Sequence, residues 1–207
     1  METEGQPPQP MLPRGFAGRI FGFLMERLAE SNYAWVVDQL RTIESRTYLE
    51  IGFGTGKLAE LVARELKPTC ICGVDPSLLM FERAARRLRR YHRTIEVDLR
   101  VGNDSHLPWA ERSFDAIVAS HSFQFWSDPH RTLRRIHRLL RPSGRFIVVL
   151  RSHRKISRKV RAWLPNPITK SGRELEALRS VLAETGFRIV CDQRLESGSQ
   201  GLIVECV

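Results

Sequence analysis

The chain has 207 residues, of which 42% are hydrophobic and 27% are charged, and this composition is ordinary for one soluble globular domain. It excludes a wholly disordered chain, a collagen-like chain and a bundle of membrane-spanning helices. Lysine and arginine number 33 against 23 acidic residues, so the net charge of +10 indicates either an anionic partner or a solvated basic surface.

The N-terminal part of the chain divides into a tail and a helical region. Residues 1–10 are polar and rich in proline, which predicts a disordered tail. Apolar residues recur at helical spacing over 20–28 and again over 35–40, so residues 11–45 are predicted to form a cap of two helices that meet near 30–32. The chain shows neither a signal-peptide pattern nor a long apolar run, and we expect a cytoplasmic location.

Short β-branched runs alternate with longer amphipathic runs along the rest of the chain, which is typical of a mainly parallel sheet covered by helices. The predicted strands are 47–51, 69–75, 95–101, 114–120, 145–150, 187–193 and 202–207. The predicted helices are 57–66, 77–91, 128–140 and 171–186. Residues 196–201 are too short for a parallel crossover, so one of the last two strands must run antiparallel. We therefore predict a single α/β domain over 11–207, with its core at 46–150 and a C-terminal helix and hairpin at 171–207.

Residues 151–170 form a basic segment that separates the core from the C-terminal helix. Over 151–164, arginine, lysine and histidine side chains occupy one predicted helical face and apolar side chains occupy the other. Two interpretations stay open for this amphipathic helix. It either covers the pocket with a solvated basic face outward, or it makes a peripheral contact with an anionic membrane.

The four cysteines do not predict a disulfide framework in a chain of this length, and we expect four reduced thiols. No Cys-x-x-Cys pair and no histidine pair with zinc-finger spacing occurs, so no metal site is expected. Cys70 and Cys72 are predicted to point to opposite faces of one strand.

A glycine-rich turn, with Gly52, Gly54 and Gly56, follows the first predicted strand. Glycine permits a sharp turn and lets the backbone approach a ligand closely, because it has no Cβ. The spacing differs from the Gly-x-Gly-x-x-Gly pattern of dinucleotide-binding proteins, which disfavours a nicotinamide cofactor. Asp75 ends the next strand, where a carboxylate can accept hydrogen bonds from both hydroxyls of a ribose. The alternative is a purely structural turn, with Asp75 as a helix-capping residue.

These segments, in this order, resemble class I S-adenosylmethionine-dependent methyltransferases, in particular their ubiquinone/menaquinone-biosynthesis-like (type 11) branch. The matching segments are 48–56, 73–77, 102–109, 113–115 and 139–145. The resemblance covers about residues 48–150. It implies a Rossmann-like fold with a mainly parallel seven-stranded sheet, helices on both faces and a C-terminal antiparallel hairpin. It also implies an enzyme that uses S-adenosylmethionine.

The resemblance further implies roles for single residues. Glu50 and the three turn glycines would hold the methionine end of the cofactor, and Asp75 would bind the ribose hydroxyls. Pro76 and Met80 would line the adenine slot.

The adenine amino group has two candidate partners. Asn103 stands where the family usually has aspartate, and its side-chain oxygen can still accept a hydrogen bond. The carboxylate of Asp104, one position later, could accept that bond instead.

Polar residues follow the predicted strand 114–120 and are candidates for the region near the transferred methyl group: Ser120, His121, Ser122 and Gln124. Ser120 is included among the expected cofactor-binding residues. His121 is the candidate catalytic base because histidine titrates near neutral pH, and the alternative is a histidine with a structural role only. In-line methyl transfer needs mainly positioning, no metal, and a base only where the acceptor must lose a proton.

The acceptor predicted first is a small-molecule or lipid-like compound. A methyltransferase acting on RNA or another nucleic acid is an alternative that the net charge favours. Residues 120–123 nevertheless lack the Asp/Asn/Ser-Pro-Pro-Tyr/Phe motif that usually accompanies amino-group methylation of bases. A second alternative is a non-catalytic cofactor-binding partner subunit, and the oligomeric state is not predicted.

Overall fold

The structure is a computed structural model that describes residues 30–43, 45–150 and 174–207. The predicted tail at 1–10, the predicted helix around 20–28 and the basic segment at 151–170 lie outside these residues. In the described part of the chain, no helix combines the length and the apolar character that crossing a membrane requires.

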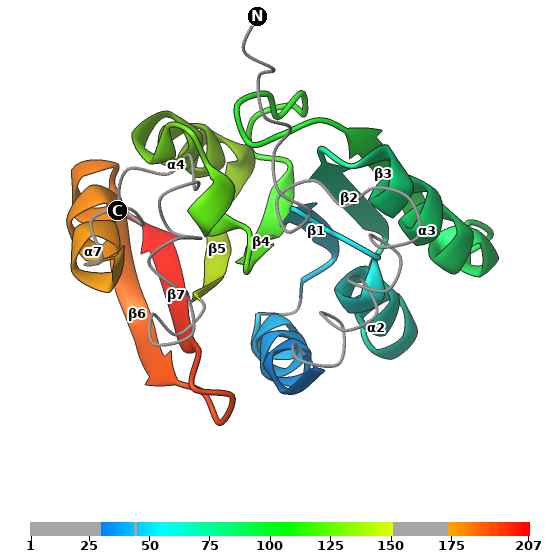
Figure 1. Cartoon of the computed structure of the whole chain (residues 1–207), viewed down its shortest axis with the longest axis horizontal. Coiled ribbons are helices and arrows are strands. Elements are labelled where there is room, and N and C mark those ends of the chain that lie inside the picture. Colours follow the sequence, from blue (N-terminus) through cyan, green and yellow to red (C-terminus); the bar gives the residue numbers. More distant parts are fainter. Residues whose placement is uncertain (1–29, 44, 151–173) are drawn as a thin grey trace, which may run out of the picture.

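Seven strands form one sheet in the order β3-β2-β1-β4-β5-β7-β6 (Figure 1). Their bounds are Thr47–Ile51 (β1), Cys70–Asp75 (β2), Glu96–Val101 (β3), Phe114–Ser120 (β4), Leu140–Leu150 (β5), Phe187–Arg194 (β6) and Gln200–Cys206 (β7). Strands β1 to β5 pair in parallel, whereas β7 runs antiparallel to both β5 and β6. The predicted α/β fold with a C-terminal antiparallel hairpin is therefore confirmed.

Helices cover both faces of this sheet (Figure 1). Their bounds are Lys57–Glu65 (α2), Leu78–Leu88 (α3), Pro129–Leu139 (α4) and Glu174–Glu184 (α7), with short 3-10 turns at Arg89–Tyr91 (η1) and Phe123–Phe125 (η2). A further N-terminal helix covers residues 30–42. The N-terminal helix, α2 and α3 pack on one face, and α4 and α7 pack on the other.

Alternation along the strands explains these two layers. Tyr48 and Val118 belong to the apolar cluster under the N-terminal helix and α2, whereas Leu49 and Ile117 belong to the cluster under α4 and α7. Successive side chains of a strand point to opposite faces, so a strand buried on both faces reads as a continuous apolar run. That is the pattern from which these strands were predicted.

Two local predictions are wrong. The expected meeting of two helices near 30–32 is not among them, because the first predicted helix lies outside the described residues, and from residue 30 onward the described chain is helical. The strand predicted at 145–150 begins earlier, because β5 already pairs with Phe114 at Leu140 and residues 142–144 form an irregularity inside it. Cys70 and Cys72 share one face, with their Sγ atoms 3.5 Å apart, because residues two apart on a strand point the same way.

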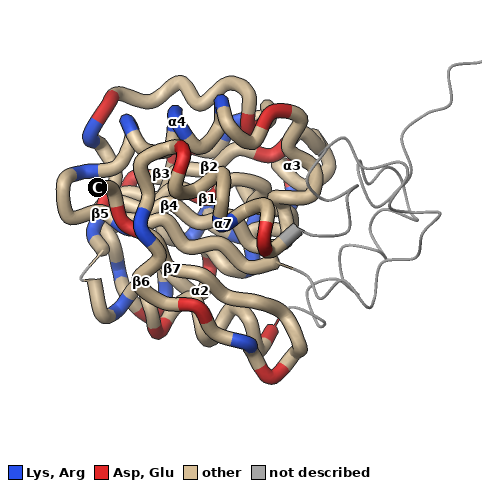
Figure 2. Tube along the Cα trace, turned by 90° about the vertical axis from the view of Figure 1, so that its left-hand side faces the viewer, with Lys and Arg blue, Asp and Glu red and all other residues tan. Residues whose placement is uncertain are grey.

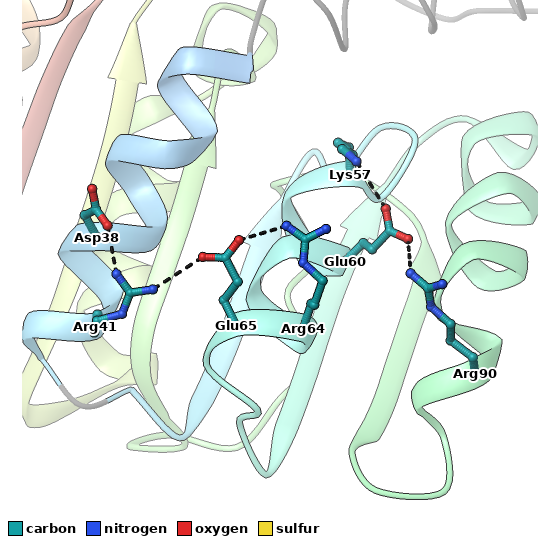
Figure 3. A network of polar contacts seen from close by, with 7 residues as sticks. All are labelled: Asp38, Arg41, Lys57, Glu60, Arg64, Glu65 and Arg90. Carbon is teal, nitrogen blue, oxygen red and sulfur yellow. Dashed lines mark hydrogen bonds and ion pairs between the residues drawn. The ribbon is translucent and has the colours of Figure 1, made fainter.

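An ion-pair cluster around Glu60 joins α2 to α3 and to η1, and Figure 3 draws its contacts with Lys57 and Arg90. The Glu60 carboxylate accepts hydrogen bonds from Lys57 Nζ at 3.4 Å, Arg87 at 3.0 Å and Arg90 at 2.6 Å. Burial raises the pKa of Glu60, but the Arg87 and Lys57 cations outweigh burial and lower it overall. The carboxylate therefore favours its charged form in the folded protein.

Glu60→Gln is expected to lower the free energy of unfolding at neutral pH by about 1–3 kcal/mol, because it removes a charge-assisted cluster. A lowered folded-state pKa stabilises above the unfolded pKa, so the deficit should shrink as the pH falls below about 4. The matched control is Glu65→Gln, because Glu65 is an exposed carboxylate paired with Arg41 and Arg64. This substitution should lower the free energy of unfolding by about 0.5 kcal/mol or less. Urea unfolding at several pH values measures both, and equal losses would contradict the special role of Glu60.

Candidate functional site

The turn between β1 and α2 is left-handed at all three glycines, with φ of 81° at Gly52, 52° at Gly54 and 74° at Gly56. A Cβ at Gly52 would lie 2.5 Å from Ser122 Cβ, and one at Gly56 would lie 2.7 Å from Ala84 Cβ. These two glycines are therefore required by packing inside the protein. A Cβ at Gly54 would meet nothing within 4 Å among the described residues. The Gly54 backbone faces open space, which is where a ligand can approach the main chain.

Asp75, at the end of β2, ties this turn to the start of α3. Its Oδ2 accepts a hydrogen bond from Gly54 N at 2.8 Å, and its Oδ1 accepts one from Ser77 N at 2.9 Å. Burial raises the pKa of Asp75, while the two N–H donors act against that rise. Each carboxylate oxygen has further acceptor capacity, so the side chain can also receive ribose hydroxyls.

Glu50 is a buried carboxyl group directly before the glycine turn, only 3% exposed. Its Oε2 accepts a hydrogen bond from the Tyr48 hydroxyl at 2.8 Å. Burial raises the pKa of Glu50 to about 8; the bond from Tyr48 opposes this rise and the nearby Asp75 adds to it. A cation bound beside Glu50 would favour its charged form, so the group is suited to an ammonium ligand.

A pH-dependent stability effect follows from the raised pKa of Glu50. Between its unfolded value and about 8, the folded state holds the proton more tightly, so stability falls as the pH rises through this window. Glu50→Gln should therefore raise the free energy of unfolding near pH 9 by about 2–5 kcal/mol, at about 1.4 kcal/mol per pH unit. Near pH 5 the two proteins should be almost equally stable. Urea unfolding at both pH values tests this, and a pH-independent difference would contradict it.

Ser120, the last residue of β4, presents a buried polar atom on the same face of the sheet as Glu50 and Asp75. This shared face follows from the register, in which Glu50 stands between Gly73 of β2 and Val118 of β4. Ser120 Oγ has no hydrogen-bond partner among the residues that the structure describes. An unsatisfied buried hydroxyl is costly and is typical of a position that a ligand completes.

In the loop after β3, the two candidates for the adenine contact lie in different environments. Asn103 is exposed, and its Oδ1 accepts hydrogen bonds from Ser105 N and Oγ at 3.1 and 2.5 Å. Asp104 is buried and accepts a bond from Thr132 Oγ1 of α4 at 2.7 Å, and burial raises the pKa of Asp104. Asp104 is thus engaged with α4, whereas Asn103 stays at the surface of the loop.

Sequence reasoning missed the residue that holds this loop in place. Arg135 of α4 donates to the carbonyl of Leu107 at 2.9 Å and to that of Trp109 at 2.5 Å. No local pattern distinguishes Arg135 from the other arginines of its helix, because its partners are backbone groups 26 and 28 residues away.

The two other adenine candidates differ in exposure. Pro76 is exposed at the start of α3, and Met80 is 3% exposed inside the first turn of that helix. The backbone N–H of Met80 donates a hydrogen bond to Ser77 Oγ at 3.4 Å, and Ser77 thereby caps the helix. Leu78, which the sequence did not single out, is 60% exposed between them.

Two of the polar residues that follow β4 bond to nearby backbone carbonyls. Ser122 Oγ donates to the carbonyl of Ile51 at 2.5 Å, and Gln124 Nε2 donates to the carbonyl of His121 at 2.6 Å. These contacts give Ser122 and Gln124 structural roles. His121 has a left-handed backbone, with φ of 57°, and its Nε2 lies 2.9 Å from Asn32 Nδ2.

Comparisons with known proteins match the core of the chain to methyltransferases. A family model described as a methyltransferase domain matches residues 49–148. Over 114 residues, the chain is 33% identical to the demethylmenaquinone methyltransferase of Thermotoga maritima, a match that covers 55% of this chain and 47% of that protein. The chain thus spans about half the length of that relative.

Solved structures share the fold at low sequence identity. A complex between the Trm112 methyltransferase activator of Haloferax volcanii and a methyltransferase matches with a TM-score of 0.70 at 17% identity, over 90% of this chain and 92% of that one. Geranyl diphosphate C-methyltransferase from Streptomyces coelicolor A3(2), solved with S-adenosylhomocysteine, matches with a TM-score of 0.69 at 17% identity, over 98% and 90% of the two chains. Residues 49–148 thus match a methyltransferase domain, which is the resemblance that the motifs predicted.

Proposed function

We propose that this protein transfers the methyl group of S-adenosylmethionine to a small, lipid-like acceptor. The observation that supports S-adenosylmethionine as the cofactor is the arrangement of polar groups at the ends of β1, β2 and β4. Asp75 bonds to the Gly54 backbone, which faces open space, and the buried carboxyl group of Glu50 lies on the same face of the sheet. Ser120, whose hydroxyl has no hydrogen-bond partner among the described residues, shares that face. These groups fit the ammonium, the sugar and the polar parts of an adenosyl amino acid.

Each residue of this site has a defined task in the proposal. Glu50 binds the amino group of the methionine end, and the Gly54 backbone lies against that end. Asp75 accepts the ribose hydroxyls while it keeps the turn closed. Asn103 contacts the adenine, because Asp104 already accepts a bond from Thr132. When bound, the cofactor supplies a sulfonium-activated methyl group, and the protein contributes mainly by orienting the two reactants.

Calorimetry tests the cofactor directly. We expect the protein to bind S-adenosylmethionine and S-adenosylhomocysteine, and not to bind NAD, because the turn lacks the dinucleotide spacing. Binding of NAD with neither adenosyl ligand would overturn the proposed function. The protein used should be the full chain of 207 residues.

The class of acceptor is supported by the relative that acts, by its name, on demethylmenaquinone. We therefore propose a prenylated quinol as the first acceptor to test, with a short-chain demethylmenaquinol as the probe. Methyl transfer is measured as label passing from methyl-labelled S-adenosylmethionine to the extracted quinol. Label that appears in RNA instead, with binding that weakens steeply with salt, would support the nucleic-acid alternative.

The charge distribution does not favour that alternative. In the described part of the chain, basic and acidic residues are interspersed in the view of Figure 2. Exposed arginines on α3 and η1, such as Arg86 and Arg89, lack interleaved aromatic side chains for base stacking except near Tyr91. A protein that binds the cofactor but labels no acceptor would support the second alternative, a non-catalytic partner subunit.

A further inference from the structure

A buried tyrosine hydroxyl lies against the carboxyl group of Glu50. Tyr48 and Glu50 are two residues apart on β1, so their side chains point to the same face of the sheet. The Tyr48 hydroxyl lies 2.8 Å from Glu50 Oε2, and Tyr48 is fully buried. In such a water-excluded environment a hydrogen bond is electrostatically stronger than it is in water. This contact can therefore influence the charge state of Glu50.

One oxygen of the Glu50 carboxyl group is left for a ligand. Tyr48 is the hydrogen-bond partner of Oε2, and among the described residues Oε1 has none. The β1–β2 register pairs Glu50 with Gly73, two residues before Asp75, so Glu50 and Asp75 share a face of the sheet. Asp75 is close enough to raise the pKa of Glu50 by its charge, and it also bonds to Gly54 N. Glu50 thus lies beside the turn that the proposed cofactor site uses.

The charge state of Glu50 decides which of the two groups donates. A carboxylate can only accept, so the Tyr48 O–H must donate to Oε2 whenever Glu50 is charged. Burial raises the pKa of Tyr48 well above its usual value, and the charge of Glu50 adds to the rise, so the phenol keeps its proton at neutral pH. A donor of this kind favours the charged form of a carboxyl group. Tyr48 is thus a built-in partner for the charged form of Glu50.

Without a ligand, Glu50 holds a proton at neutral pH. Burial raises its pKa to about 8, the bond from Tyr48 opposes this rise, and the charge of Asp75 adds to it. The other titratable group beside this pair is Tyr33 of the N-terminal helix, which acts on Tyr48. On β4, Glu50 pairs with Val118, which carries no charge. No cation among the described residues acts on Glu50. An ammonium ligand would supply one, and an opposite charge at close range lowers the pKa of a carboxyl group.

We propose that Tyr48 is a positioning residue for the cofactor: its hydroxyl holds the charged form of Glu50, so that Oε1 binds the ammonium group of the methionine end while the Glu50 proton leaves to solvent. The exchange balances, because the ammonium group keeps its protons and one proton passes from the Glu50 carboxyl group to the buffer. This inference rests on the proposed function and adds to it a residue that touches no ligand and a dependence of cofactor affinity on pH.

Calorimetry with S-adenosylhomocysteine counts the protons released. The full chain is titrated at pH 7 in phosphate and in Tris, two buffers with different heats of ionisation, and the difference in heat gives the count. Since its pKa is about 8, Glu50 is about nine-tenths protonated at pH 7, so the wild type should release about one proton per ligand bound. Glu50→Gln should release none. Equal heats in the two buffers for the wild type would overturn the proposal.

Tyr48→Phe removes the donor and keeps the buried ring. The pKa of Glu50 should then rise further, by about one unit, because the hydrogen bond no longer opposes the effect of burial. More free energy is then needed to remove the proton, so Tyr48→Phe should bind S-adenosylhomocysteine about tenfold more weakly at pH 7. At pH 9 most of the wild-type Glu50 is already charged, and the deficit should shrink to about twofold. A structural role alone would lower the affinity equally at every pH.

Tyr91→Phe is the matched control. Tyr91 packs against the same apolar cluster as Tyr48, but it lies on η1, which follows the C-terminal end of α3. The substitution removes the same chemical group, so it controls for the loss of a tyrosine hydroxyl from this cluster. Its affinity for S-adenosylhomocysteine and its proton count should equal those of the wild type.

The outcomes separate this inference from the proposed function. A wild-type protein that binds no S-adenosylhomocysteine at any pH would overturn the proposed function and this inference with it. Binding without proton release, or a Tyr48→Phe deficit that stays the same from pH 7 to pH 9, would overturn this inference alone. If Tyr48→Phe does not fold, the proton counts of the wild type and of Glu50→Gln decide.

Discussion

Replacing Asp75 with alanine is expected to weaken the binding of S-adenosylhomocysteine by about 100-fold or more. Asp75 accepts hydrogen bonds from Gly54 N and Ser77 N, so its removal leaves two buried donors without their acceptor and loosens the turn. It also removes the proposed partner of the ribose hydroxyls. Hydrogen bonds to a charged group contribute about 1.5–3 kcal/mol each, and two of them account for this loss.

The matched control for this variant is Asp98→Ala. Asp98 belongs to the neighbouring strand β3 and bonds to Arg100 and Trp109. Its side chain lies on the face of the sheet opposite to that of Asp75. Its loss should leave the affinity for S-adenosylhomocysteine within about threefold of the wild type, since it removes no contact with the turn. Calorimetry measures both variants, and wild-type affinity in Asp75→Ala would contradict the ribose assignment.

Two neighbouring glycines should respond in opposite ways to the same added methyl group. Gly54→Ala adds a Cβ that meets nothing within 4 Å, so the cost to folding is the left-handed backbone, about 1–2 kcal/mol. The methyl group would, however, enter the space proposed for the cofactor. We expect a folded protein whose affinity for S-adenosylhomocysteine is reduced by about 100-fold.

Gly56→Ala should instead damage the fold itself. The added Cβ would lie 2.7 Å from Ala84 Cβ and 2.9 Å from Ala84 Cα, where α2 meets α3. Overpacking and the unfavourable φ together should lower the free energy of unfolding by about 3 kcal/mol or more. Urea unfolding and calorimetry on both variants separate the two effects. Loss of stability without loss of affinity for S-adenosylhomocysteine in Gly54→Ala would contradict the proposal that the cofactor binds at this turn.

The sequence by itself indicated most of the helices and strands and the resemblance of residues 49–148 to a methyltransferase domain. Strand positions such as 47–51 and 114–120 followed from apolar runs, because burial on both faces of a sheet leaves a local signal. The glycine turn and Asp75 were also visible, since the backbone geometry of such a turn restricts which residues can occupy it. The closing antiparallel hairpin followed from the length of one connection.

Only the tertiary structure decided which polar groups meet. The bond of Asp104 to Thr132 distinguishes it from Asn103, and Asn32 Nδ2 lies 2.9 Å from His121 Nε2 across 89 residues of sequence. Helical periodicity reports that a residue is buried but not which distant hydroxyl, amide or ring nitrogen lies beside it. Hydrogen-bond partners 28 or 89 residues apart are set by how the helices pack on the sheet, and pKa shifts such as that of Asp104 follow from that packing.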